Sequence, residues 1–130
     1  MKRVLTFGVF DLMHYGHIRL FERAKHIDEN VHLVVAVQRD SAVTKYKPEA
    51  VLKYNEEIRS YMVESIRYVD EVVSYTDVDR DVQTIDFDIL CLGEDQTHAG
   101  FQRAIEYCQK HEKEVIVLSR TKGISSSMLR

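Results

Sequence analysis

The sequence predicts an α/β domain in which five parallel strands form one doubly wound sheet with helices on both faces. Two observations lead to this prediction: short β-branched apolar runs recur along the chain, and segments of helical periodicity separate them. Parallel strands covered by helices on both faces are buried throughout, so they read as continuous apolar runs. The 130 residues include one proline and are 45% hydrophobic, which fits a single domain spanning 1–130.

Five apolar runs are the predicted strands, in chain order VLTFGVF (4–10), VHLVVAV (31–37), DEVVSY (70–75), DILCLG (88–93) and EVIVLS (114–119). Three predicted helices lie between them, at 16–28, 55–68 and about 99–111. Each should bury a face of residues spaced three or four apart: Leu20, Phe21, Ala24 and Ile27, then Ile58, Tyr61, Met62, Ser65 and Ile66, then Phe101, Ala104, Ile105 and Cys108. The stretch from Gln38 to Tyr54 is predicted to be an irregular loop, and loops of that length often carry function.

Charge and cysteine content exclude several classes of protein. The 18 basic and 21 acidic residues give a net charge of -3, so no global field favours nucleic acid or a membrane surface, and any anion site must be local. Cys91 and Cys108 lack metal-type spacing and are predicted to be reduced packing residues. The first apolar run is too short for a signal-peptide core or a membrane span, so we expect a cytoplasmic protein.

The strongest local pattern is F-G-V-F-D-L-M-H-Y-G-H at 7–17, where the first strand leads into the first helix. Gly8 lets a backbone approach a ligand closely, and a helix N-terminus beyond a parallel strand attracts phosphate. His14 and His17 could donate to the same phosphate oxygens, with Gly16 leaving the space between them open. The alternatives are a turn cap, a surface-packed ring or metal ligation. The last is disfavoured because no cysteine or carboxylate completes a ligand set, so we expect no protein-held metal.

A second pattern, R-T-K-G-I-S-S-S at 120–127, directly follows the last predicted strand. Arg120 can fork onto phosphate oxygens, and Gly123 permits a tight turn. Ser125 and Ser126 can cap a helix while offering donors to an anion. The alternative is an ordinary loop and helix cap.

The remaining candidates are individually weaker. Lys45 and Lys47 lie in the predicted loop, where they could close over a triphosphate or form part of a solvated charge run. Arg59 and Arg67 could bind a ligand or be solvent-facing helix charges. The G-E-D sequence at 93–95 follows the fourth strand and could hold a base, a ribose or a metal-bound water, or simply form a turn.

Together these segments resemble the bacterial glycerol-3-phosphate cytidylyltransferase family, within the HxGH nucleotidyltransferases. The likeness runs nearly end to end and covers H-Y-G-H at 14–17, E-R-A-K at 22–25, I-R-Y-V-D-E-V at 66–72, G-E-D at 93–95 and R-T-K-G-I-S-S-S at 120–127. The last segment is similar to the family signature R-T-x-G-I-S-[ST]-[ST], which favours CTP over ATP. The resemblance implies a Rossmann-like fold, Mg²⁺ as cofactor and a homodimer.

The resemblance also assigns roles to residues. It implies catalytic contacts with the CTP phosphates from His14, His17, Lys45 and Arg120. Nucleotide binding is implied for Gly8, Val9, Phe10, Gly16, Gly93, Asp95, Thr121, Gly123, Ile124, Ser125 and Ser126. Acceptor binding is implied for Lys47, Arg59 and Arg67.

The function expected from this resemblance is transfer of CMP from CTP to a small phosphorylated alcohol. Glycerol 3-phosphate is favoured, which gives CDP-glycerol and pyrophosphate for teichoic acid or capsule synthesis. The chain departs from the family at Val9, where a threonine or cysteine is usual, in having no tryptophan, and in nearly lacking the terminal helix because it stops at Arg130. The alternatives are therefore another acceptor, such as phosphocholine, phosphoethanolamine or a phosphosugar, or a non-catalytic nucleotide-binding module.

Overall fold

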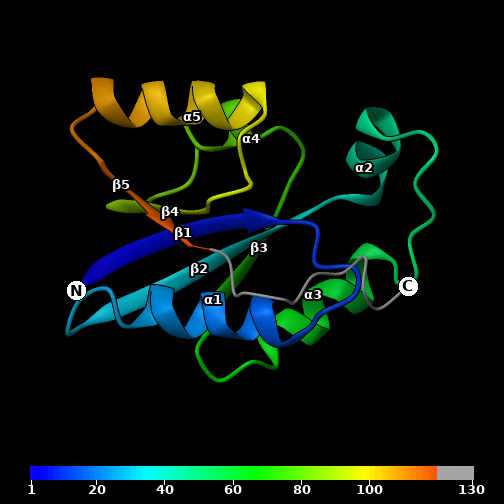
Figure 1. The fold of residues 1–130 in the computed structure, drawn as a ribbon, viewed down its shortest axis with the longest axis horizontal. Helices are drawn as coiled ribbons and strands as arrows, with labels where there is room; N and C mark the ends of the chain where they lie inside the picture. The colour runs from blue at the N-terminus through cyan, green and yellow to red at the C-terminus, as the bar shows by residue number, and fades with distance from the viewer. Residues whose placement is uncertain (120–130) are drawn as a thin grey trace.

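A computed structural model describes residues 1–119 and places five parallel strands in one sheet (Figure 1). The strands are β1 (Lys2–Gly8), β2 (Val31–Gln38), β3 (Glu71–Tyr75), β4 (Ile89–Gly93) and β5 (Glu114–Leu118). The helices are α1 (Tyr15–Lys25), α2 (Asp40–Tyr46), α3 (Glu56–Glu64), α4 (Val78–Asp81) and α5 (Ala99–Lys110). The strand order β3-β2-β1-β4-β5, with every pair parallel, confirms the predicted Rossmann-like α/β fold. The chain adds β2 and β3 on one side of β1 and β4 and β5 on the other, so the switch point of the sheet lies between β1 and β4.

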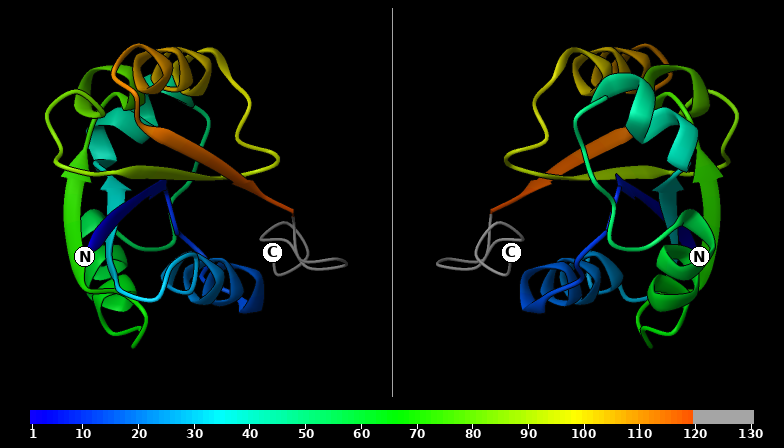
Figure 2. Two further views of the ribbon diagram at one scale, coloured as in Figure 1. Left: turned by 90° about the vertical axis from the view of Figure 1, so that its left-hand side faces the viewer. Right: turned by 90° about the vertical axis from the view of Figure 1, so that its right-hand side faces the viewer.

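Helices cover both faces of the sheet, as the views from the two sides show (Figure 2). α1 and α3 lie on one face, where Phe21, Ala24 and Val63 pack against buried residues of the strands. α4 and α5 lie on the other face. The sheet is therefore wound in both directions, as predicted, and its central strand β1 is buried between two helical layers.

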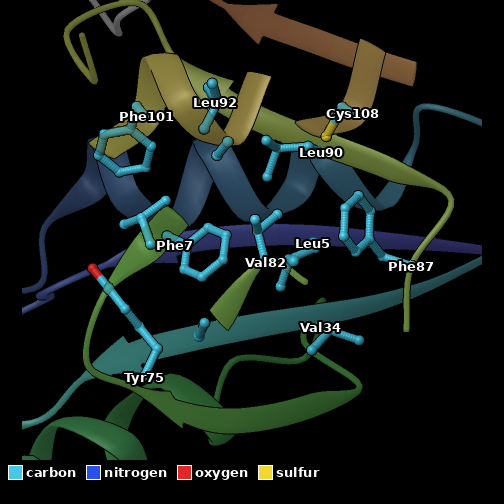
Figure 3. Packing of buried hydrophobic residues seen from close by; sticks show 13 residues of the cluster. Leu5, Phe7, Val34, Tyr75, Val82, Phe87, Leu90, Leu92, Phe101 and Cys108 are labelled. Atoms are coloured by element: carbon cyan, nitrogen blue, oxygen red, sulfur yellow. The ribbon is translucent and has the colours of Figure 1, made fainter. Parts of the chain in front are cut away.

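The core under α5 is built around aromatic rings (Figure 3). The Phe7 ring meets Tyr75 edge-on at a centroid distance of 4.9 Å and Phe101 at 6.4 Å. Cys91 and Cys108 are buried free thiols, and burial raises the pKa of both, so they are packing residues as expected. No helix within residues 1–119 is both long and apolar enough to cross a bilayer.

Two local predictions were wrong. The stretch from Gln38 to Tyr54 is not wholly irregular, because α2 forms within it. The buried face of α3 consists of Arg59 and Val63, whereas Ile58 and Tyr61 are 43% and 67% exposed. Of the predicted face, Ile66 does pack against the core, but the apolar spacing did not indicate Arg59, since nothing local in the sequence shows that an arginine is buried.

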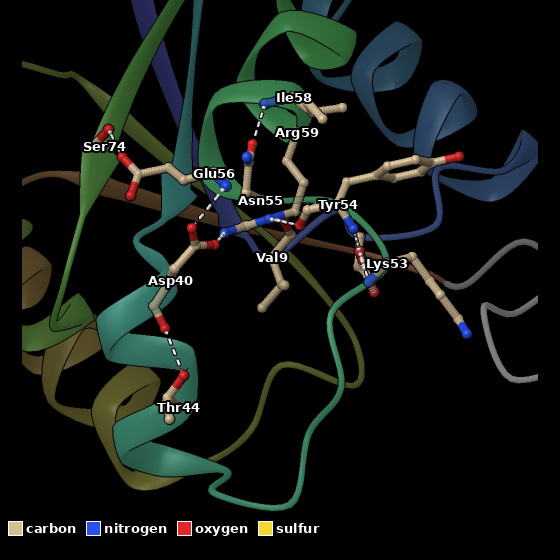
Figure 4. Close-up of polar contacts among 11 residues, drawn as sticks. Val9, Asp40, Thr44, Lys53, Tyr54, Asn55, Glu56, Ile58, Arg59 and Ser74 are labelled. Atoms are coloured by element: carbon tan, nitrogen blue, oxygen red, sulfur yellow. Dashed lines mark hydrogen bonds and ion pairs between the residues drawn. The ribbon is translucent and has the colours of Figure 1, made fainter.

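A completely buried arginine side chain, Arg59, joins three segments near the end of β1 (Figure 4). Its guanidinium donates to the Asp40 carboxylate at 2.6 Å, to the Val9 carbonyl at 2.8 Å and to the Tyr54 carbonyl at 3.1 Å. The second Asp40 oxygen accepts the backbone N–H of Glu56 at 3.1 Å. One buried cation thus fixes α2, α3 and the turn after β1 relative to one another.

Replacing Arg59 should destabilise the whole domain. Arg59→Met removes the cation from Asp40 and the donors from two carbonyls, and we expect a loss of about 2 to 3 kcal/mol because these groups remain partly buried. Urea denaturation measures this loss. Arg67→Met is the matched control at an exposed position, where we expect a change within about 0.5 kcal/mol. Equal stabilities of the two variants would contradict this account of Arg59.

Candidate active site

The candidate site lies at the carboxyl ends of β1 and β4, where the winding direction of the sheet reverses. Such switch points leave a crevice beyond the strand ends, and ligands of open α/β sheets bind there. The turn after β1 leads to His14 and α1, and the turn after β4 carries Asp95. The fold therefore brings together the first histidine motif and the G-E-D segment, which lie about 80 residues apart in the chain.

Phe10 shapes the turn after β1. Its φ of 55° lies in the left-handed region, which ends the strand at Gly8, earlier than predicted. Its buried ring occupies the space beside Gly8, because a Cβ there would come within 2.4 Å of the ring. The same ring meets His17 edge-on at 5.4 Å. Gly8 thus makes room for the Phe10 ring, whereas the sequence suggested that it makes room for a ligand. Phe10 in turn packs against the His17 ring.

His14 and His17 are held by backbone N–H groups at the start of α1. His14 is the helix N-cap, and its Nδ1 accepts the Gly16 N–H at 3.0 Å. The Nδ1 of His17 accepts the His14 N–H at 3.2 Å. Because each Nδ1 acts as an acceptor, the proton of each neutral ring lies on Nε2. The cap and phosphate-donor interpretations of His14 are therefore compatible.

The two imidazoles stack on each other, with centroids 4.0 Å apart and planes inclined by 21°. The space that Gly16 was expected to leave open is thus filled by the rings themselves. Burial lowers the pKa of His17 to about 4, with a further decrease from His14 and an opposing increase from the nearby Asp95 carboxylate. At neutral pH His17 is an uncharged Nε2–H donor beside Asp95.

The turn after β4 is compact around Gly93. A Cβ on Gly93 would come within 3.2 Å of the Asp95 carboxylate, so the glycine leaves room for that side chain. The Asp95 side chain is exposed at the edge of the site. Gly93 and Asp95 thus lie at and just after the end of the fourth strand, as predicted, and the Asp95 carboxylate lies close enough to His17 to raise the pKa of that ring.

Lys45 and Lys47 lie on and directly after the last turn of α2 rather than in an irregular loop. Both are exposed, and the Lys45 ammonium lies 5.2 Å from the ring centre of Tyr46. Burial lowers the pKa of His98, the N-cap of α5, and the positive charge of the nearby Lys47 lowers it further. The two lysines are thus presented at the carboxyl edge of the sheet.

Neither of the two predicted acceptor-binding arginines lines the site. Arg59 is buried with its guanidinium bonded to protein groups, so in this conformation it supports the site and does not line it. Arg67 lies shortly before β3, at the amino edge of the sheet, and donates to the Tyr68 hydroxyl at 3.0 Å. Direct contact of either residue with an acceptor stays a prediction.

Six further candidates lie outside the described residues 1–119, namely Arg120, Thr121, Gly123, Ile124, Ser125 and Ser126. β5 ends at Leu118, two residues before this segment, and pairs with β4. The expected roles of these residues therefore stay predictions.

Asp11 is a supporting residue to which the sequence assigned no role, although it stands inside the first motif. Its buried carboxylate accepts the backbone N–H groups of Lys53 at 3.0 Å and Tyr54 at 2.9 Å. These bonds join the turn after β1 to the segment that leads into α3. The available signal was an acidic residue directly after a buried strand, a position commonly used to bind loop N–H groups.

The fold is that of open α/β proteins that bind ligands at the switch point of the sheet, and the two imidazoles lie there at the N-terminus of α1. The sequence profile of the cytidylyltransferase-like family matches residues 5–130. The chain therefore belongs to the cytidylyltransferase-like family, and the expected enzyme class, a nucleotidyltransferase of the cytidylyltransferase type, is confirmed.

Curated relatives match the whole chain. It is 36% identical to the glycerol-3-phosphate cytidylyltransferase of Bacillus subtilis and 37% identical to that of Staphylococcus aureus, covering 95% and 93% of those proteins. It is also 35% identical to an FAD synthase of Aciduliprofundum boonei, covering 78% of that protein. The solved structure of a lipopolysaccharide core biosynthesis protein from Thermoplasma volcanium matches 95% of this chain and 99% of that chain, with a TM-score of 0.74 and 28% identity.

The lowered pKa of His17 predicts a loss of stability in acid. The folded ring titrates at about 4 and the unfolded ring near its ordinary value of 6.5, so the unfolded chain takes up the proton first as the pH falls. The contribution of the neutral ring is complete above about pH 6.5 and is lost as the pH falls toward 4. Between pH 7 and pH 5, His17 should account for about 2 kcal/mol of lost unfolding free energy.

Urea denaturation of the wild type and of His17→Asn at these two pH values measures this contribution. The asparagine keeps an acceptor for the His14 N–H and cannot titrate. We expect the variant to lose about 2 kcal/mol less than the wild type over this interval. The same loss in both proteins would show that the folded ring titrates normally.

Proposed function

We propose that this protein transfers CMP from CTP to glycerol 3-phosphate, giving CDP-glycerol and pyrophosphate. The observation that carries this proposal is the pair of imidazoles at the start of α1, each with its proton on Nε2. This pair lies beyond the carboxyl end of β1, at the switch point between β1 and β4, where a nucleoside triphosphate would bind. Two relatives named glycerol-3-phosphate cytidylyltransferase, each matching the whole chain, support the choice of substrates.

The proposed reaction is an in-line displacement at the α-phosphorus of CTP. An oxygen of the acceptor phosphate forms the new P–O bond, the bond to the β-phosphate oxygen breaks, and pyrophosphate leaves with that electron pair. The acceptor phosphate is already ionised, so no residue has to remove a proton. Catalysis then consists of orienting two anions and stabilising the charge that develops on the phosphoryl oxygens.

Neutral histidines suit this task. An Nε2–H donor held by backbone bonds requires no reorientation as negative charge develops, and the N-terminal end of α1 adds a positive dipole. Two stacked rings cannot both carry positive charge at low cost, which fits the lowered pKa of His17. In the proposal, full positive charge comes from Lys45, Lys47 and Arg120.

Mg²⁺ is proposed to enter as a complex with the triphosphate. Within residues 1–119 no three histidine, cysteine or acidic side chains are arranged to hold a metal ion. In the proposal the cation is bound mainly through substrate phosphates, which is the usual mode for Mg²⁺ in phosphoryl-transfer sites. The ion would neutralise charge on the leaving pyrophosphate.

The acceptor is the least supported part of the proposal. The similarity to an FAD synthase is nearly as high as that to the cytidylyltransferases. Val9 stands where the resembled family carries a side-chain donor. A second phosphorylated acceptor, such as phosphocholine, phosphoethanolamine or a phosphosugar, is the main alternative, and a non-catalytic nucleotide-binding module is the other.

Three further features complete the proposal; the first and the third rest on the family resemblance, and the second rests on the short apolar run at the start of the sequence. We propose a homodimer, a cytoplasmic location and a role in teichoic acid or capsule synthesis, which is where CDP-glycerol would be consumed.

Pyrophosphate release from CTP and from ATP, each with Mg²⁺ and a panel of phosphorylated acceptors and FMN, tests this proposal. We expect release with CTP and glycerol 3-phosphate. Release only with another acceptor would keep the mechanism and change the substrate. Release only with ATP and FMN would contradict both assigned substrates, and CTP binding without any product would favour the non-catalytic alternative.

Removing the donor of His17 tests the mechanism with the same assay. We expect His17→Ala to lower kcat about 100-fold or more, because one preorganised donor to the developing charge is lost. His111→Ala is the control, since His111 is exposed at the far end of α5. Circular dichroism checks that both variants are folded. Full activity in a folded His17→Ala protein would contradict the assigned role.

A further inference from the structure

The hydrogen-bonded pairing between β1 and β4 stops before either strand ends. The ladder between them ends at Leu5 and Leu90, whereas β1 continues to Gly8 and β4 to Gly93. On the other side of β1, pairing with β2 runs to the last residue of β1. The carboxyl ends of β1 and β4 therefore lack ladder pairs with each other at the position where the site lies.

The side chain of Gln96 bridges this interval. Its Nε2 donates to the Phe7 carbonyl at 2.8 Å, and its Oε1 accepts the Gly93 N–H at 3.0 Å. A carbonyl can only accept and a backbone N–H can only donate, so these partners fix the orientation of the amide. The Gln96 amide thus supplies the donor and the acceptor that a ladder peptide group would supply between paired strands.

The two ends of this bridge support the two halves of the site. Phe7 directly precedes Gly8 and the turn that leads to the histidine pair. Gly93 begins the turn that carries Asp95, and the Gln96 N–H closes that turn by donating to the Gly93 carbonyl at 3.1 Å. The Asp95 carboxylate raises the pKa of His17, so the turn after β4 and the start of α1 interact electrostatically.

We propose that Gln96 is a positioning residue for nucleotidyl transfer. Its amide fixes the separation between the turn after β1, which leads to His14 and His17, and the turn after β4, which carries Asp95. Positional errors of about 1 Å in a catalytic arrangement cost roughly 100-fold in rate. The link to turnover rests on the proposed function, whereas the bridge itself does not.

Gln96→Met is the informative substitution because methionine has a similar length and no amide. We expect kcat to fall about tenfold or more and the nucleotide KM to rise. The midpoint of thermal unfolding should fall modestly, because the Phe7 carbonyl and the Gly93 N–H lose their partner. Gln102→Met is the matched control, since within residues 1–119 the Gln102 amide donates to the Thr97 carbonyl just before α5 and to no strand. The control should retain kcat and KM within about twofold of the wild type.

Two NMR measurements test the bridge without substrate. In Gln96→Met, the Gly93 amide should exchange with solvent about tenfold faster or more, and the His17 ring resonances should shift. Unchanged His17 resonances, unchanged Gly93 exchange, or kcat and KM equal to the wild type would each overturn the proposal. If the wild type turns over no substrate pair, the proposed function fails, and the exchange and His17 resonances still decide whether Gln96 couples the two turns.

Discussion

Two backbone N–H groups at the start of α1 determine what the site can do. The Gly16 N–H and the His14 N–H each donate to an imidazole Nδ1, so they fix the tautomer and the orientation of both rings. If either bond were absent, the ring could rotate or place its proton on the buried nitrogen. The phosphate-binding proposal therefore depends first on helix capping, an interaction usually discussed only in terms of stability.

The rest of the domain maintains this arrangement from several directions. Phe10 supports His17, and Gly8 leaves the space that the Phe10 ring needs. Asp11 and Arg59 then bind the turn to the segments before and within α3 through buried hydrogen bonds. These contacts use polar groups that are buried and paired, so they impose geometry at little risk of alternative packing. The site is thus rigid where phosphate charge would develop and exposed at the lysine-bearing end of α2.

The sequence was sufficient for the fold because apolar runs and helical spacing are local signals. It was insufficient for α2, a seven-residue helix whose N-cap Arg39 makes no side-chain cap bond and whose first residue, Asp40, is held by a cation 19 positions away. It also misjudged α3, since only the tertiary partner of Arg59 explains why that arginine is buried. In the site, the motif predicted that His14 and His17 lie one turn apart at the start of the first helix, but the stacking of their rings and the bridge from Gln96 to Phe7 depend on geometry that the motif does not show.

The tautomeric state of the two histidines is the most direct test of this account. Long-range ¹H–¹⁵N NMR correlations of the imidazole rings, recorded from pH 8 to pH 5 on the wild-type protein, distinguish the two neutral tautomers from the charged form. The account predicts the Nε2–H pattern for both rings at neutral pH, and for His17 a neutral ring throughout this range, since its pKa is lowered to about 4. An Nδ1–H pattern, or a His17 ring that is charged at pH 7, would contradict the central claim.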